Sequence, residues 1–384
     1  MKTIVNIVSD EDPTPAYLFI KESYEPGDHL LFISAKEAEA DLQHFASLFD
    51  IDPSLIHRII LKHEDDYMRY ELICRRLVKQ LDSDTHYWVN LAGGSRYMAI
   101  AVHQCFASRK ALFFYVRSRE NQIVKSLFND EIYSNNDVVY AIRHRMSLRE
   151  YLRICRIEND LDKPEEHLPT QSADYCAHFF AMFTGQMLSN SDFNVIEMLR
   201  LHYRGQARVA ISYIEHPKNP KRTAIPNLSN FLAHIGFQTQ ERGVLLKEEL
   251  DFITGGWFEE YVYHLVKEYL NPQDIAIGLH VKRRGTHHDN ELDVAFMLDN
   301  QFHVIECKTG VPTEKLFNEI VYKACALRES FLGSQCRSHL FTLRSDFDGE
   351  LTKIAALMDI DFADRTCITS PERIQQKLLS IAQE

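Results

Sequence analysis

NELDVAFMLDNQFHVIECKTG, residues 290–310, predicts two paired β-strands around a turn supplied by residues 298–301, LDNQ. Both arms are mainly apolar, but the first carries Asp293, with Glu291 on the same face, and the second carries Glu306 and Lys308. Residues two apart in a strand share a face. Pairing of the arms is therefore expected to gather Asp293, Glu306 and Lys308 in one small volume.

A further acidic residue comes from the helix expected over residues 253–270, ITGGWFEEYVYHLVKEYL. Glu259 lies on the apolar stripe of this helix and is expected to face the protein interior. Glu260 lies off that stripe and is expected to face solvent. The helix would thus direct one carboxylate towards the charged hairpin.

Buried carboxylates without a partner cost several kcal/mol or become protonated. A divalent cation resolves this, since Mg²⁺ and Mn²⁺ take oxygen ligands. We therefore predict that Glu259, Asp293 and Glu306 hold the metal and that all three act in catalysis together with Lys308. The lysine would orient a water or stabilise charge on a phosphate. The alternative is a carboxylate–lysine salt-bridge network at a sheet edge.

The fold class predicted is α/β, in three parts. About 120 residues at the N-terminus alternate between apolar strands and amphipathic helices, which predicts a Rossmann-like parallel sheet covered on both faces and ending in a hairpin. A mainly helical connector follows, for which a winged-helix-like module is one interpretation. The last part reads helix, three strands, helix, strand, which predicts an α/β domain with a mixed sheet. The domain boundaries predicted are 1–143, 144–248 and 249–384.

The segment NLAGGSR, residues 90–96, follows the fourth strand of the N-terminal sheet. In open α/β sheets ligands bind outside the carboxyl ends of the strands. Paired glycines, a hydroxyl and Arg96 at a helix start offer N–H groups and a cation to an anion. A tight strand-to-helix turn without a ligand is the alternative. NAD and FAD are disfavoured because the first strand is not followed by GxGxxG.

The net charge of −12 does not indicate nucleic-acid binding by itself, so such a role would depend on local basic patches or on metal ions. Lys282, Arg283 and Arg284 form either such a patch or a solvated hairpin loop. The eight cysteines contain no CxxC pair, and the chain shows neither a signal peptide nor an apolar run of about 20 residues. A cytoplasmic protein without a membrane segment is expected.

Asp293 followed by Glu306-x-Lys308, with Glu259 on a helix upstream, resembles the PD-(D/E)xK restriction-endonuclease-like nucleases. Leu292 stands where the motif's name has proline. Over nearly the whole chain, VNIVS, VNLAGGSRYMA, ITGGWFEEYVY and NELDV…HVIECK together resemble the CRISPR ancillary nucleases of type III systems. These proteins join a CARF domain, here residues 1–143, to a PD-(D/E)xK nuclease domain.

The resemblance implies a homodimeric endonuclease of antiviral defence, activated by a cyclic oligoadenylate, commonly cyclic tetra-adenylate, bound across the dimer axis. It implies cleavage of RNA, DNA or both with little sequence preference, dependent on Mn²⁺ or Mg²⁺. The usual Asn-x-Thr-Gly-Gly-Thr-Lys loop appears here as NLAGGSR, with Ala92 in place of the threonine. The ring contacts carried over are Ser9, Asn90, Gly93, Gly94, Ser95 and Arg96. The resemblance also adds Lys323 to the basic substrate patch.

Two other functions remain open. One is a constitutive restriction- or repair-type DNA endonuclease whose N-terminal domain reads DNA structure. The other is a nucleotide-responsive DNA-binding regulator with an inactive C-terminal domain, against which the intact acidic–lysine set argues. RNA and DNA both stay candidate substrates, since no element that reads a 2′-hydroxyl is recognisable.

Overall fold

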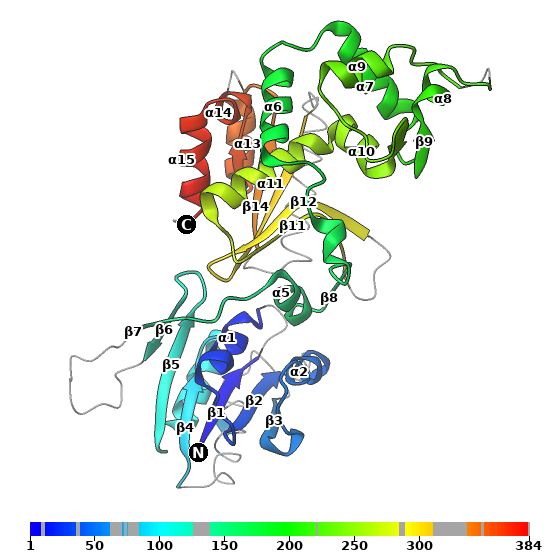
Figure 1. Ribbon diagram of the computed structural model, residues 1–384. Coiled ribbons are helices and arrows are strands. Elements are labelled where there is room, and N and C mark those ends of the chain that lie inside the picture. The colour runs from blue at the N-terminus through cyan, green and yellow to red at the C-terminus, as the bar shows by residue number, and fades with distance from the viewer. Residues whose placement is uncertain are drawn as a thin grey trace.

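The computed structural model describes residues 1–8, 12–35, 39–61, 71–72, 75, 84–125, 139–219, 222–283, 289–309, 336–346 and 349–382. Figure 1 shows the N-terminal sheet as one lobe and a second sheet, flanked by the C-terminal helices, as another. The helices of the connector extend from the side of the second lobe (Figure 1). This arrangement confirms the predicted α/β class.

The first sheet has the strand order β3-β2-β1-β4-β5-β6-β7. Its first five strands are parallel, and β6 and β7 continue it as an antiparallel hairpin. The strands are β1 (Lys2–Ile7), β2 (His29–Ala35), β3 (Ile56–Leu61), β4 (His86–Asn90), β5 (Ala111–Arg117), β6 (Gln122–Lys125) and β7 (Val139–Ala141). The helices described here are α1 (Thr14–Ser23), α2 (Glu39–Ala46) and α4 (Arg96–Phe106). The central apolar strands β1 and β2 are buried almost throughout, because helices pack against both faces of the sheet there.

The second sheet is mixed and has the order β15-β14-β13-β12-β11-β8. Strands β8, β11, β12 and β13 pair antiparallel, whereas β13, β14 and β15 run parallel. The strands are β8 (Ile157–Asn159), β11 (Asp274–Arg283), β12 (Asp289–Leu298), β13 (Gln301–Lys308), β14 (Cys336–Thr342) and β15 (Asp361–Ala363). Asp299 and Asn300 both have positive φ, at 48° and 64°, as a two-residue hairpin turn requires.

One face of the second sheet shares its hydrophobic core with the connector. Trp257, at the start of α11 (Trp257–Leu270), packs its ring 5.2 Å from that of Phe179 in α6 (Ala173–Thr184). The remaining helices here are α7 (Asn190–His202), α8 (Ile211–Glu215), α9 (Leu228–His234), α10 (Lys247–Asp251), α13 (Glu350–Leu357), α14 (Arg365–Ile368) and α15 (Pro371–Ile381). Strands β9 (Arg208–Ala210) and β10 (Val244–Leu246) form a separate two-stranded antiparallel sheet within the connector.

The other face of the second sheet shares a core with the first lobe. Helix α5 (Leu148–Ile154) lies at this junction, where Tyr151 stacks on Phe302 of β13 with ring centroids 4.9 Å apart. The two lobes are thus joined by packed side chains as well as by the chain itself. Of the helices described, none combines the length and apolar character needed to cross a membrane.

Candidate functional site

The charged residues of the β12–β13 hairpin lie together at its open end. Lys308 Nζ is 3.1 Å from Asp293 Oδ2 and 2.7 Å from Glu306 Oε1. Asp293 is only 8% exposed, and its Oδ2 also accepts a hydrogen bond of 2.7 Å from the backbone N–H of Cys307. Strand pairing between β12 and β13 therefore brings two carboxylates and an ammonium into direct contact.

Burial and mutual repulsion shape the ionisation of this cluster. Burial, together with the charge of Glu306, raises the pKa of Asp293 from 3.8 to about 6, although Lys308 and the Cys307 N–H oppose this rise. Burial would lower the pKa of Lys308, but Asp293 and Glu306 outweigh it and raise the pKa above the usual range. Lys308 consequently keeps its positive charge at neutral pH.

Glu259, in the first turn of α11, completes the acidic group. Burial, followed by the negative charges of Asp293 and Glu291, raises its pKa from 4.5 to about 8. Lys308 acts against this shift. Glu259 is therefore close enough to the hairpin cluster for the carboxylates to repel one another.

The expectation for the neighbouring Glu260 was wrong. Glu260 is only 5% exposed, and its carboxylate accepts hydrogen bonds from Thr170 Oγ1 at 2.7 Å and from Gln171 N at 2.8 Å. Helix α11 is covered by α6 as well as by the sheet, so its buried surface is wider than one apolar stripe. Glu260 holds the chain entering α6 against α11.

The oxygen atoms of these carboxylates are suitable ligands for a hard divalent cation, but their present positions do not form a metal site. Glu259, Asp293 and Glu306 offer oxygen ligands, which Mg²⁺ and Mn²⁺ prefer. Burial first, and neighbouring negative charge second, raise the pKa values of Glu259 and Asp293, and a bound cation would oppose both effects. Within the described part of the chain, however, no group of three His, Cys, Asp or Glu side chains is placed to hold a metal ion. The ammonium of Lys308 lies between Asp293 and Glu306, so metal binding would require it to leave one of them.

The structure adds charged residues that the sequence did not single out. Arg204, just after α7, has its Nε 3.7 Å from Asp251 Oδ1, and its charge lowers the pKa of Glu259. Burial raises the pKa of Asp251, while Arg204 and Lys247 lower it. Glu291 lies two residues before Asp293 in β12, so strand alternation already predicts that the two share a face. Arg204 could not be found from such a pattern, because it comes from the connector.

The NLAGGSR segment forms the turn between β4 and α4. The buried Asn90 donates from Nδ2 to Asn6 Oδ1 at 3.0 Å and to the carbonyl of Pro15 at 3.3 Å. Gly93 and Gly94 have positive φ, at 97° and 67°, and a Cβ on Gly93 would lie 2.6 Å from the carbonyl oxygen of Ile7. The glycines thus let the turn lie directly against the end of β1.

The helix start after this turn is capped and open to solvent. Ser95 Oγ accepts a hydrogen bond of 3.3 Å from Met98 N, while Arg96 is exposed in the first turn of α4. The structure therefore brings Asn90, the glycines, Ser95 and Arg96 to one sheet edge.

The basic patch is described only in part. Lys282 lies in β11 opposite Asp289, and Arg283 ends the same strand. Arg284 and Lys323, together with Ser9 of the first lobe, lie outside the described residues.

The chain matches two family models. One, described as the Card1 CARF domain, covers residues 3–151, and the other, described as a Card1-like endonuclease domain, covers residues 246–357. No match was found among the curated proteins.

Solved structures match the whole fold at low sequence identity. Protein VC1899 from Vibrio cholerae has a TM-score of 0.72 and 17% identity, covering 100% of this chain and 97% of that one. Can2 from Sulfobacillus thermosulfidooxidans, in complex with cyclic tetra-adenylate, has a TM-score of 0.69 and 17% identity, covering 100% and 98%. A type III CRISPR defence DNA nuclease activated by cyclic oligoadenylate has a TM-score of 0.52 and 15% identity, covering 89% of this chain and 45% of that one.

Proposed function

Because the chain belongs to the CRISPR-associated proteins that join a Card1 CARF domain to a Card1-like endonuclease domain, we propose that it is an endonuclease activated by a cyclic oligoadenylate, in particular cyclic tetra-adenylate. The observation that carries this proposal is the buried carboxylate–lysine cluster on β12 and β13, supported by Glu259 of α11. Such a cluster suits hydrolysis of a phosphodiester, in which negative charge develops on the phosphate.

Each residue of the cluster has a role that its surroundings favour. Lys308 stays charged and lies at the centre of the cluster, so it can stabilise charge on the scissile phosphate or orient the attacking water. Asp293, Glu306 and Glu259 would hold Mn²⁺ or Mg²⁺. When bound, the metal would supply a Lewis acid and lower the pKa of a bound water. The N–H of Cys307 fixes the orientation of the Asp293 carboxylate.

The proposed site for the activator is the β4–α4 turn of the first lobe. Its backbone approaches β1 closely at Gly93, and the exposed Arg96 offers a cation to an anionic ring. A cyclic ring across a two-fold axis needs two copies of this turn, so we propose a homodimer. Exposed apolar side chains next to the turn support this, since Tyr97 is 54% and Ile100 49% exposed on α4.

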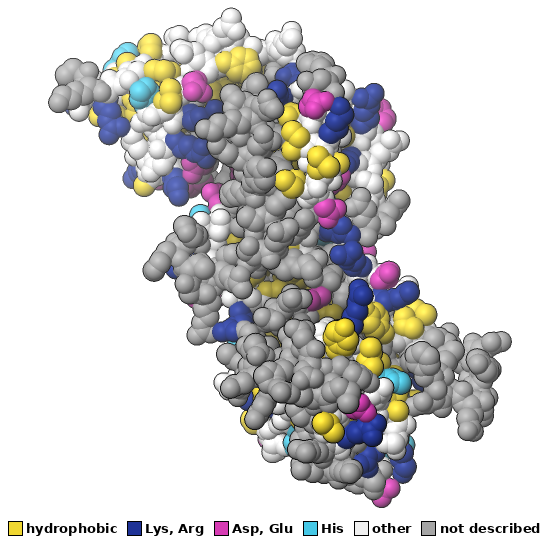
Figure 2. All heavy atoms as spheres, turned by 180° about the vertical axis from the view of Figure 1, so that it is seen from behind, with side chains coloured by type: hydrophobic (Ala, Val, Ile, Leu, Met, Phe, Trp, Pro, Cys, Tyr) yellow, Lys and Arg dark blue, Asp and Glu magenta, His cyan; other side chains and the backbone are white. Residues whose placement is uncertain are grey.

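The proposed substrate is nucleic acid, RNA or DNA. Arg204 of the connector acts on the pKa of Glu259, and Lys247 acts on that of the neighbouring Asp251. Figure 2 shows Lys and Arg side chains on the surface of the molecule. Those we expect to contact substrate phosphates are Arg204, Arg208, Arg242 and Lys247, all exposed. We place the reaction in the cytoplasm, in keeping with the six described cysteines, all of them free.

The proposal is tested with Asp293→Asn and Lys308→Ala. Both variants and the wild type are incubated with Mn²⁺, cyclic tetra-adenylate and labelled single-stranded RNA, single-stranded DNA or supercoiled plasmid. Cleavage is expected to fall at least 100-fold, while binding of the ring, measured by calorimetry, is unchanged. Glu268→Gln, an exposed residue of α11, serves as the control and should cleave normally. Full cleavage by either cluster variant would overturn the site assignment.

A further inference from the structure

The turn between β12 and β13 lies against the first lobe, far along the strands from the charged cluster. We propose that Asn300, in this turn, is the positioning residue through which the state of the first lobe reaches the catalytic hairpin. The inference rests on the proposed function, because it concerns how the activating ring would act on the cluster.

Asn300 is 1% exposed, and its side chain is fully hydrogen-bonded. Its Oδ1 accepts from Met146 N at 2.8 Å and from Gln273 Nε2 at 3.0 Å. Its Nδ2 donates to Asn121 Oδ1 at 2.7 Å and to the carbonyl of His144 at 2.9 Å. One side chain thus joins the hairpin turn to the β5–β6 turn of the first sheet and to the segment between the lobes.

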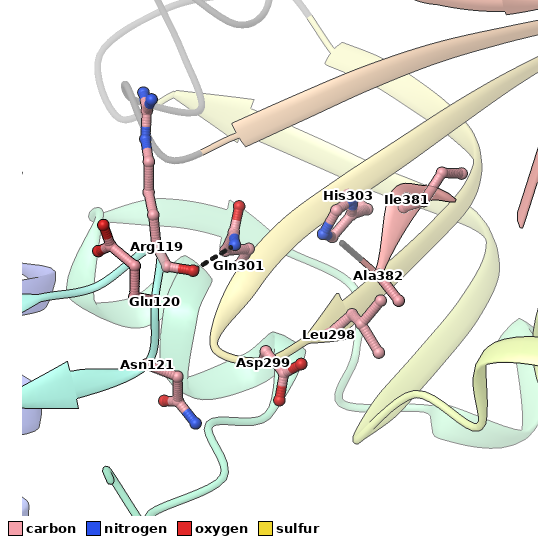
Figure 3. A pocket seen from close by; sticks show the side chains of 9 residues that line it. All are labelled: Arg119, Glu120, Asn121, Leu298, Asp299, Gln301, His303, Ile381 and Ala382. Atoms are coloured by element: carbon pink, nitrogen blue, oxygen red, sulfur yellow. Dashed lines mark hydrogen bonds between the residues drawn. The ribbon is translucent and has the colours of Figure 1, made fainter. Parts of the chain in front are cut away.

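The next residue, Gln301, adds to these hydrogen bonds between the hairpin turn and the first lobe, which together are called the joint. Gln301 Nε2 donates to the carbonyl of Arg119 at 3.1 Å, as the dashed line in Figure 3 shows. Beside these contacts lies a cavity of about 340 Å³, lined by both turns, by His303 and by the end of α15. Figure 3 shows side chains of both lobes around this space. The joint is therefore made of directional hydrogen bonds with free volume beside it, which lets the turn shift without displacing packed core.

Towards the ligand loop, the joint continues through α1. Glu22, near the end of α1, accepts hydrogen bonds from Arg143 N at 2.8 Å and His144 N at 2.6 Å. The start of α1 contacts the β4–α4 turn, since Asn90 Nδ2 lies 3.3 Å from the carbonyl of Pro15. A ring that displaces the turn between β4 and α4 would push on α1 and hence on the carbonyl that Asn300 binds.

Towards the cluster, the joint continues through β13. Gln301 and Glu306 are five residues apart in one strand, so about 17 Å separates them at 3.3 Å per residue. Alternation places Phe302, Glu306 and Lys308 on one face of this strand, and Phe302 is the residue that stacks on α5. A strand paired on both sides moves as a unit, so a shift of the turn would change how Lys308 and the carboxylates meet.

The test is Asn300→Gly, with Asp299→Gly as the matched control. Both residues have positive φ, which glycine adopts without strain, so the turn itself is preserved. Asp299 makes one long contact, 3.9 Å to Arg145, with both side chains about half exposed. Three quantities are measured: ring affinity, cleavage without ring, and cleavage with saturating cyclic tetra-adenylate.

We expect Asn300→Gly to bind the ring and to keep its basal cleavage, while the ratio of activated to basal rate falls at least tenfold. Asp299→Gly should match the wild type in all three quantities. Activation of Asn300→Gly equal to that of the wild type overturns the inference alone. Loss of its ring binding or basal cleavage also overturns the inference, because Asn300 would then merely hold the fold. A wild type that no ring activates overturns the proposed function, and the inference with it.

A double-mutant cycle with Asn121→Gly locates the effect, since Asn121 also has a positive φ of 52°. If the 2.7 Å bond between the two amides transmits activation, the double variant should lose no more activation than Asn300→Gly alone. Losses that multiply would show that Asn121 and Asn300 act separately and would contradict a shared joint.

Discussion

The half-buried Glu259 of α11 should destabilise the folded protein at neutral and higher pH, and Glu259→Gln should remove this effect. The pKa of Glu259 is raised from 4.5 to about 8, chiefly by burial and then by Asp293 and Glu291. Between these values the unfolded chain releases the proton while the folded protein retains it. The free energy of unfolding therefore falls as pH rises through this window, by up to about 1.4 kcal/mol per pH unit.

The full shift corresponds to about 5 kcal/mol. Relaxation around the partly exposed side chain should reduce this value, so we expect the charged Glu259 to lower the free energy of unfolding by about 2 kcal/mol or more. Glutamine fills nearly the same space without the charge. In the presence of a chelator, the variant should match the wild type near pH 4.5 and exceed it in stability by about 2 kcal/mol at pH 8.

Urea unfolding followed by tryptophan fluorescence measures this difference. The chain has two tryptophans, Trp88 and Trp257, one in each lobe. A Trp88→Phe background leaves Trp257, two residues before Glu259, as the only reporter. Glu268→Gln, exposed on the same helix, should keep the pH dependence of the wild type. An equal pH dependence for Glu259→Gln and the wild type would refute a buried group of mutually repelling carboxylates.

Three further outcomes are expected. Gly93→Ala should weaken binding of cyclic tetra-adenylate at least tenfold by calorimetry, because its Cβ would lie 2.6 Å from the Ile7 carbonyl oxygen; unchanged affinity would contradict the turn as the ring site. Despite its burial, contacts with His144 and neighbouring donors lower the pKa of Glu150 from 4.5 to about 2. Glu150 contributes about 1–2 kcal/mol to the free energy of unfolding after allowing for its 31% exposure. This contribution is present above pH 4.5 and lost towards pH 2, so the free energy of unfolding of Glu150→Gln should fall less steeply on acidification than that of the wild type. Arg204→Ala should raise KM for nucleic acid several-fold, reduce its salt dependence and leave kcat nearly unchanged, and a loss confined to kcat would place Arg204 in the chemistry instead.

Local patterns were sufficient to predict the strands and the hairpin cluster. The central strands β1 and β2 of the first sheet are buried on both faces, which explains why their sequences are almost continuously apolar. Alternation along β12 and β13 placed Asp293, Glu306 and Lys308 together because a strand has a fixed period of two. Asp299 and Asn300 marked the turn, since both residue types tolerate positive φ.

Contacts between distant parts of the chain could not be predicted in this way. Glu260 is buried because α6 covers α11. The apolar stripe of α11 does not indicate that a second element packs against another face of the helix. Arg204 reaches the acidic group only through the fold of the connector. Asn300 reads as an ordinary turn residue, yet its partner Asn121 lies 179 positions away in sequence. Tertiary packing, rather than local preference, decides each of these cases.

The most direct test of a ring-controlled nuclease compares cleavage of one labelled substrate by the wild type, with Mn²⁺, in the presence and absence of cyclic tetra-adenylate. The ring should accelerate cleavage at least 100-fold, and Lys308→Ala should show no cleavage in either condition. An equal wild-type rate with and without the ring would contradict the account and would favour a constitutive nuclease.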